Sequence, residues 1–311
     1  MRRRATAIVT TAVVLGSMGT LPATAADPVK VLTTKADEYN PAASDTYLSW
    51  NVWNGSSNIV YAKAFGGSRM RVSPTGWHGW VGSIEDTSLT YQQYSQKKGV
   101  SDIYRVDLVT KKRSKLPAAI NTERWEYGPS ESGGIIAFAR VLPTSDRKLI
   151  VYDMGSRTSR TIATSSGVRV ILEVGQVSGN WLAYERHVHD KDGRAIACDV
   201  WRYDIAGGSS TKIPNPNDRC QYGPSVDPAG TVYFARGGFT CGTNQSIQAY
   251  PVGGPVATLI QLTDGRRGFS TYFSTYAVDN GDNTTDLYYD PSRCKADGSY
   301  GSGDIFKVTT P

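Results

Sequence analysis

The chain has 311 residues and a formal net charge of +6, and 39% of its residues are hydrophobic, 10% aromatic and 20% charged. This apolar and aromatic content can bury a large core, and it excludes an intrinsically disordered or collagen-like chain. With 32 Gly and 18 Tyr against only 4 Met, the composition favours a turn-rich β protein over a helical bundle.

The N-terminus has the pattern of an export signal. Three arginines at positions 2–4 precede an apolar run over residues 5–15, and a small-residue segment follows. We predict that residues 1–25 are a secretory signal peptide, with cleavage after Ala26 as the alternative, and that residues 26–311 form one exported domain. The apolar run is too short to anchor the protein in a membrane. Loss of the signal leaves 31 basic and 28 acidic residues, a net charge of +3, and no long basic run that would indicate a nucleic-acid partner.

A short apolar pattern recurs down the rest of the chain. Its six copies begin at Asn58, Asp102, Lys148, Asp199, Ser246 and Asp304, in steps of 44, 46, 51, 47 and 58 residues. A second β-rich run precedes each copy, and Pro- and Gly-containing turns, clearest over residues 127–134 and 222–230, lie further upstream. A short Thr/Ser-rich or basic strand follows each of the first four copies, as at residues 159–163. These spacings are typical of the four-stranded blades of a β-propeller.

The two ends of the chain complement each other. Only three residues follow the last copy, which leaves no fourth strand for that blade. Residues 29–33 resemble an outer strand and precede the first blade. We therefore predict an all-β fold, a six-bladed β-propeller closed by an N-terminal strand that completes the last blade, because such closure removes free sheet edges.

Two of the inner hairpins indicate a family. Residues 222–235, with Gly-Pro-Ser at 223–225 and Asp-Pro-Ala-Gly at 227–230, resemble the repeat of TolB-like six-bladed propellers, and residues 127–138 resemble it too. The resemblance implies the fold but says little about activity. Propellers serve as binding scaffolds, lyases, hydrolases and peptidase accessory domains. TolB has an additional α/β domain, for which we expect no room here because the closing strand begins near residue 27.

All four cysteines, Cys198, Cys220, Cys241 and Cys294, lie in the second half of the chain and are expected to form two disulfides of an exported protein. In a propeller, the starts of the inner strands share one rim with the loops that join second and third strands. The topology therefore predicts that all four lie on that rim and that the bridges join adjacent blades. We prefer the pairs Cys198–Cys241 and Cys220–Cys294, and the other two pairings remain open. The spacings lack the close ligand pairs of zinc sites, and we expect no metal or cofactor.

The mouth of the central channel is the expected ligand site. Its predicted lining from the inner strands consists of Tyr39, Trp80, Trp125, Glu126, Glu173, Gln221, Tyr222 and Tyr272. Glu126 and Glu173 are expected on neighbouring blades, where they could act as an acid/base pair in glycoside cleavage. The aromatic residues of this set could equally pack between blades.

Two polar segments have residue types that can bind metals. His187 and His189 lie at i and i+2 of an expected strand, and two aspartates follow them. We interpret them as a polar hairpin tip, with a metal site as the alternative. Residues 279–286 offer several oxygen ligands for Ca²⁺ but lack the Glu and Gly positions of an EF-hand loop, so we interpret them as a solvated hairpin.

These patterns favour an exported, non-catalytic propeller that binds a protein, peptide or glycan, and that is secreted or held in the cell envelope as a monomer. The sequence contains no G-x-S-x-G, H-E-x-x-H or Walker motif. The alternative is a carbohydrate-active enzyme, a polysaccharide lyase or glycoside hydrolase, that uses carboxylates at the channel. We expect no nucleic-acid partner and no membrane span after signal cleavage.

Overall fold

The computed structural model describes residues 26–32, 34, 36–95, 97, 99–216, 218–238, 241, 245–262, 267–269 and 273–311. Within these residues the chain forms 27 β-strands and no helix, which confirms the predicted all-β class. A search of the same residues finds no helix long and apolar enough to cross a membrane. The predicted signal peptide, residues 1–25, lies outside the described residues.

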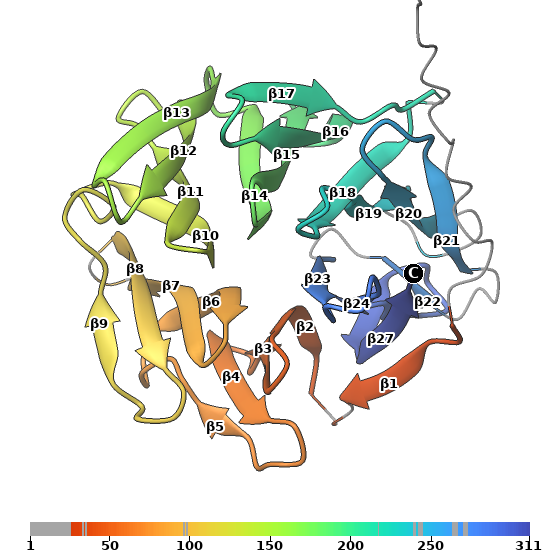
Figure 1. Cartoon of the computed structure of the whole chain (residues 1–311), viewed down its shortest axis with the longest axis horizontal. Coiled ribbons are helices and arrows are strands. Elements are labelled where there is room, and N and C mark those ends of the chain that lie inside the picture. The colour runs from red at the N-terminus through yellow and green to blue at the C-terminus, as the bar shows by residue number, and fades with distance from the viewer. Residues whose placement is uncertain are drawn as a thin grey trace, which may run out of the picture.

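The strands form successive antiparallel units around a common centre (Figure 1). The first unit consists of β2 (Glu38–Ala43), β3 (Tyr47–Trp53), β4 (Asn58–Ala64) and β5 (Met70–Arg71). The second consists of β6 (His78–Glu85), β7 (Ser88–Ser95), β8 (Val100–Asp107) and β9 (Arg113–Lys115). The third consists of β10 (Trp125–Ser132), β11 (Ile135–Val141), β12 (Arg147–Asp153) and β13 (Thr158–Ser165). One parallel bridge, from Ser101 to Trp125, joins the second and third units into one sheet.

The remaining units complete the ring of the propeller (Figure 1). The fourth unit consists of β14 (Val170–Ser178), β15 (Trp181–His189), β16 (Ala195–Asp204) and β17 (Ser209–Lys212). The fifth consists of β18 (Cys220–Val226), β19 (Val232–Gly237), β20 (Gln245–Tyr250) and β21 (Ala257–Leu262). The last consists of β23 (Thr275–Asp279), β24 (Thr285–Tyr289), β27 (Ile305–Thr310) and β1 (Val29–Leu32). A small separate sheet contains β22 (Arg267–Gly268), β25 (Ser292–Cys294) and β26 (Tyr300–Gly303). The described strands thus divide into six four-stranded units and this small sheet.

The N-terminal strand closes the last unit. β1 pairs antiparallel with β27, with Val29 opposite Lys307 and Leu32 opposite Ile305. The Leu32 side chain is only 9% exposed, and it joins the core between the last and first units. β1 is therefore the outer strand that the sequence predicts over residues 29–33, with residue 33 itself outside the described residues.

The inner strands approach one another so closely that glycine is required. β6, β10, β14 and β18 each have an irregular register near the middle of the strand. A Cβ atom on Gly82 of β6 would lie 2.2 Å from the carbonyl oxygen of Pro129 in β10. A Cβ atom on Gly175 of β14 would lie 2.0 Å from the carbonyl oxygen of Pro224 in β18. These contacts fix the spacing between neighbouring units, because any side chain would force the strands apart.

Two side chains cross the centre of the ring to units that are not neighbours. The Gln176 amide of β14 donates to the Ala277 carbonyl of β23 at 2.7 Å and accepts from the Ala277 N–H at 2.9 Å. The Tyr276 hydroxyl of β23 contacts both the N–H and the carbonyl of Ile84 in β6, at 3.2 and 3.1 Å. On β6 and β14 these bonds lie toward the end of the strand. The opposite rim, formed by the starts of the inner strands and the loops between second and third strands, is called the proximal rim below.

Apolar side chains fill the space between the units. Trp50 of β3, Phe138 of β11 and Phe234 of β19 are fully buried there. Because each sheet is covered on both faces, its strands are rich in consecutive buried residues. The rigid core leaves the proximal rim as a surface assembled from several units.

Candidate functional site

The structure pairs Cys198 with Cys220 and Cys241 with Cys294, so the preferred pairing was wrong. The Cα atoms are 4.6 and 5.4 Å apart. The third strand of a unit packs against the inner strand of the next one, and β16 therefore brings Cys198 to the start of β18. This leaves Cys241 for Cys294, which ends β25 of the small sheet, in the segment between β24 and β27. Both bridges join neighbouring units on the proximal rim, as expected.

Three of the predicted channel residues, Tyr39, Trp80 and Trp125, lie in one network on the proximal rim. The Tyr39 hydroxyl donates to the Asn58 side-chain oxygen, and the Asn58 N–H donates to Nδ1 of His78 at 3.3 Å. The His78 ring stacks on Trp80 with 5.7 Å between centroids. The starts of β2 and β6 and the start of β4 are thus tied together by polar and aromatic contacts.

Five rings form a continuous series across the first three units, which we call the aromatic row: Trp53, His78, Trp80, Tyr94 and Trp125. Trp53 stacks on His78 at 6.3 Å, and Tyr94 stacks on Trp125 at 4.6 Å with an angle of 18° between the planes. Trp80 contacts His78 and Tyr94, with 5.7 and 6.3 Å between ring centroids. The indoles at the two ends are 47% and 40% exposed, so each presents a ring surface to solvent.

Sequence reasoning found Trp80 and Trp125 but missed the other three members of the row. Trp53 ends β3, and Tyr94 lies near the end of β7, directly opposite His78 in the β6–β7 register. The ends of second strands reach the same rim as the starts of inner strands. That topological rule was available from the sequence, and applying it to second strands as well would have placed Trp53 and Tyr94 on this surface.

A polar groove of about 490 Å³ adjoins the aromatic row. Its lining consists of Ser56, Ser57, Gly76, His78, Ser95 and Lys97. The Asn54 side-chain oxygen accepts hydrogen bonds from the backbone N–H groups of Ser56 and Ser57 at 3.0 and 2.9 Å, which holds this loop in shape. Lys97 is exposed and is the one charged residue among these lining residues.

Glu126, a predicted channel carboxylate, is completely buried and bound within its own unit. Its Oε1 atom accepts from Nε of Arg140 at 2.8 Å and from the Thr122 hydroxyl at 2.6 Å. Burial raises the pKa of Glu126, while Thr122 and Arg140 act in the opposite direction. Arg140 also donates to the Ile120 carbonyl, so the pair fastens the loop before β10 to the sheet.

Glu173, the second predicted carboxylate, belongs to a cluster of ionisable groups in the fourth unit. It lies opposite Glu185 in the β14–β15 register. Nε2 of His187 lies 3.4 Å from Oε1 of Glu185, whose other oxygen accepts from the Gly223 N–H at 2.8 Å. Burial and the charge of Glu185 raise the pKa of Glu173 to about 8. Burial alone would lower the pKa of His187, but the charge of Glu185 outweighs it and raises the value to about 9.

The two carboxylates are therefore held by different partners. Glu126 binds Arg140, and Glu173 neighbours the Glu185–His187 ion pair. Neither Glu126 nor Glu173 lines the polar groove beside the aromatic row. The structure thus adds no support to the acid/base pair, which stays an expectation from the sequence.

The other predicted channel residues are buried or lie outside the described residues. Tyr222 is fully buried, donates to the Phe269 carbonyl at 3.4 Å and packs edge-on against Phe273. Gln221 is also buried, and its side-chain oxygen accepts from the Val200 N–H at 3.2 Å. Both side chains stabilise the contact between units. Tyr272 lies outside the described residues.

The two segments with metal-binding residue types lie at the β15–β16 and β23–β24 hairpins, with His187 and His189 themselves in the last residues of β15. The rings of His187 and His189 stack at 6.2 Å, and Nδ1 of His189 contacts the Gly193 carbonyl at 3.1 Å. In the second hairpin, Asp282 accepts from the N–H and hydroxyl of Thr284 at 3.0 and 2.6 Å, as in an ordinary polar turn. In the part of the chain that the structure describes, no three His, Cys, Asp or Glu side chains are grouped to hold a metal ion.

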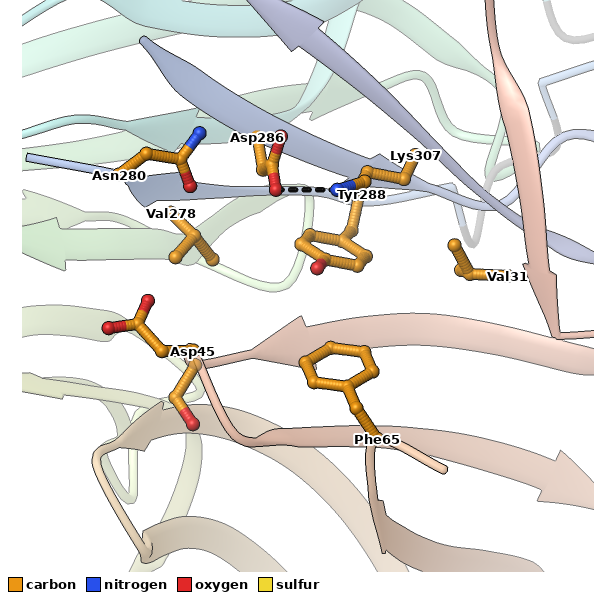
Figure 2. A pocket seen from close by; sticks show the side chains of 9 residues that line it. Val31, Asp45, Phe65, Val278, Asn280, Asp286, Tyr288 and Lys307 are labelled. Carbon is orange, nitrogen blue, oxygen red and sulfur yellow. Dashed lines mark hydrogen bonds and ion pairs between the residues drawn. The ribbon is translucent and has the colours of Figure 1, made fainter. Parts of the chain in front are cut away.

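A second groove of about 490 Å³ lies between the last and first units, away from the proximal rim (Figure 2). Its lining consists of Val31, Ser44, Asp45, Phe65, Val278, Asn280, Asp286, Tyr288 and Lys307. The Phe65 ring is 42% exposed and faces Tyr288 with 6.5 Å between centroids. Nζ of Lys307 binds Asp286 at 2.7 Å, which neutralises that carboxylate. No sequence motif indicates this groove.

No protein-family model and no curated protein matches the chain. Solved structures do resemble it. TolB from Acinetobacter baumannii aligns with a TM-score of 0.55 and 16% identity over 85% of this chain, which spans 64% of that protein's length. A putative TolB from Agrobacterium tumefaciens aligns with a TM-score of 0.55 and 15% identity, over 89% of this chain and 92% of the other.

A protein of unknown function from Dyadobacter fermentans aligns with a TM-score of 0.58 and 11% identity, over 91% of this chain and 99% of its own length. Identities this low establish a common fold and leave function to be argued from the site. The resemblance seen in the two inner hairpins therefore extends to the architecture as a whole. The chain has the fold of a TolB-like β-propeller.

Proposed function

We propose that this protein is an exported, non-catalytic propeller that binds its ligand on the aromatic row and the adjoining polar groove. The observation that carries the proposal is the exposure of Trp53 and Trp125, 47% and 40%, at the two ends of one row on the proximal rim. Tryptophan is enriched among the residues that dominate binding energy. Two exposed indoles, at the ends of a row that shares His78 with a polar groove, form a surface suited to binding.

Strand pairing and hydrogen bonds hold the row in position, which favours binding. Its members lie on strands or at strand ends, and Asn54 holds the loop that lines the groove. Asn51, which is fully buried, donates to the Gly79 carbonyl at 2.8 Å and accepts from the Val81 N–H at 3.0 Å, so it joins β3 of the first unit to β6 of the second. A preorganised surface spends little free energy on ordering when its ligand binds.

The partners of Glu126 and Glu185 support a binding role over catalysis for these two carboxylates. Glu126 is fully buried against Arg140, and Glu185 is paired with His187. A catalytic acid or base has to reach the atom it protonates or deprotonates. In these positions the carboxylates act within the protein, where they hold strands and loops together.

An exported location agrees with two separate observations. The first 25 residues have the pattern of a signal peptide. Two disulfides staple neighbouring units, and such bonds persist in oxidising compartments. We propose that the mature protein, residues 26–311, acts outside the cytoplasm as a monomer with one ligand surface.

A retention experiment tests this proposal. Immobilised mature protein, the Trp53→Ala/Trp125→Ala variant and a Phe65→Ala control are incubated with solubilised cell-envelope and culture-supernatant fractions. Phe65 is an exposed aromatic residue in the other groove, so the control removes a ring of comparable exposure elsewhere. We expect the wild type and the control to retain the same component and the row variant to lose it. Equal retention by all three would refute the proposed surface.

A further inference from the structure

We infer that the ligand of the aromatic row and its groove is an acidic glycan chain. The inference rests on the proposed function and deepens it by naming the chemical class of the ligand. A sugar ring has an apolar face of C–H groups and an edge of hydroxyls. The surface offers both complements side by side: exposed indole faces at Trp53 and Trp125, and a groove lined by serines, His78 and Lys97.

The exposed indoles fit the apolar faces of sugar rings. The π face of tryptophan carries partial negative charge, so polarised C–H groups settle over it, and the contact also removes apolar surface from water. Trp53 and Trp125 lie at opposite ends of the row, on the first and third units. Two separated ring surfaces suit a chain of several sugar units, because one sugar can stack at each end of the row while those between them follow the row past His78, which also lines the groove.

The groove fits the hydroxyl edges. Ser56 and Ser57 come from the loop after β3, where their hydroxyls also donate to the Asn54 side-chain oxygen at 3.1 and 3.5 Å, and Ser95, which is 7% exposed, ends β7. Serines thus line the groove from two units. A hydroxyl both donates and accepts, as sugar hydroxyls do. At about 490 Å³, the groove also lies within the range of sites for small ligands.

The charge of the groove selects an acidic chain. Lys97 is exposed, and no carboxylate is among the described residues that line this groove. A single ammonium group suits the occasional carboxylate of a uronic acid. Single-stranded nucleic acid also stacks on aromatic rings, but it carries one phosphate per nucleotide and is bound along a basic track. The described lining of the groove contains one lysine, and the mature chain has a net charge of +3, which favours the glycan.

The test measures binding of purified mature protein to defined polymers. Carboxymethyl cellulose and alginate are the acidic probes, hydroxyethyl cellulose is a neutral chain with the same backbone as the first, and an oligothymidylate is the nucleic-acid probe. Affinity electrophoresis and tryptophan fluorescence report binding. We expect both acidic polymers to bind, and Trp53→Ala and Trp125→Ala each to weaken binding about tenfold. Lys97→Ala should weaken it less and reduce its sensitivity to salt.

Controls separate loss of a contact from loss of the fold. Trp125→Phe keeps a stacking ring and should retain most of the affinity, and Phe65→Ala should bind like the wild type. Thermal melting of every variant checks that the propeller is intact. Equal binding of hydroxyethyl cellulose, preference for oligothymidylate, or no effect of the Trp53 and Trp125 substitutions would each overturn the inference.

The two proposals fail in different ways. If no glycan binds but the retained envelope component still depends on Trp53 and Trp125, the surface is a binding site and the acidic-glycan inference is wrong. If neither a glycan nor an envelope component depends on the row, the proposed function is wrong as well.

Discussion

Replacing Arg140 with methionine should destabilise the propeller strongly, because it leaves a buried carboxylate without its cation. Glu126 is 0% exposed, and the pair has an Nε–Oε1 distance of 2.8 Å. Removing one partner of a buried ion pair costs about 3–5 kcal/mol. Arg140 also donates to the carbonyls of Ala119 and Ile120, at 3.1 and 2.8 Å, so its loss leaves further acceptors without a donor. In a chain of this size the melting temperature should fall by on the order of 10 °C.

Urea unfolding followed by circular dichroism measures this loss. Without Arg140, the folded-state pKa of Glu126 rises further above its unfolded value. A group with a raised folded-state pKa favours the folded state at low pH, and this contribution is lost as pH rises through the folded-state pKa. The loss in free energy of unfolding caused by Arg140→Met should therefore be smaller at pH 5 than at pH 7. Adding Glu126→Gln should recover most of the lost stability. A deficit below about 1 kcal/mol, or no recovery in the double variant, would refute this account of the pair.

Three further predictions concern closure, disulfides and pH. Deleting residues 26–32 should lower the unfolding midpoint and promote association, because it exposes the edge of β27; an unchanged midpoint and a monomeric profile by gel filtration would contradict this. Non-reducing peptide mapping should recover Cys198 with Cys220, and reduction should lower stability by about 2–4 kcal/mol per bridge. His187 has a pKa raised to about 9, so its contribution to stability is full below about pH 6.5 and is lost as pH rises through 9. His187→Gln should flatten this alkaline decline in melting temperature, and an equal decline in both proteins would exclude the ion pair as its source.

The strand order was predictable because it depends on local patterns and even spacing. The six recurring apolar patterns coincide with β4, β8, β12, β16, β20 and β27. The cross-ring bonds were not predictable, since Gln176 meets Ala277, 101 residues away, and Tyr276 meets Ile84, 192 residues away. Such contacts depend on how the units rotate about the centre, and no local pattern records that rotation. The cysteine pairing failed for the same reason: Cys198 faces the next inner strand, a contact set by the stacking of units.

The candidate site was only partly predictable. Trp80 and Trp125 were found because they start inner strands, whereas Trp53 ends a second strand and was missed. The rule that placed residues at a central channel also selected Glu126 and Tyr222, both of which are fully buried. Position along a strand determines the rim on which a residue lies, but side-chain direction decides exposure. Side-chain direction alternates along a strand and shifts at each register irregularity. Position in the sequence alone therefore could not distinguish residues exposed on the rim from residues buried in the core.

Because the aromatic row extends over three units, its geometry depends on hydrogen bonds between the units that do not themselves contact the ligand. Asn51 joins the first unit to the second through the Gly79 carbonyl and the Val81 N–H, and Asn51→Ala should cost about 1–3 kcal/mol of stability. Ser49 of the same strand is equally buried, but its hydroxyl binds the Tyr61 carbonyl within the first unit, which makes Ser49→Ala a matched control. Both variants should melt at lower temperature. Only Asn51→Ala should also weaken binding at the row, because it frees Trp53 to shift relative to His78; equal affinities in the two variants would show that spacing between units does not control the binding surface.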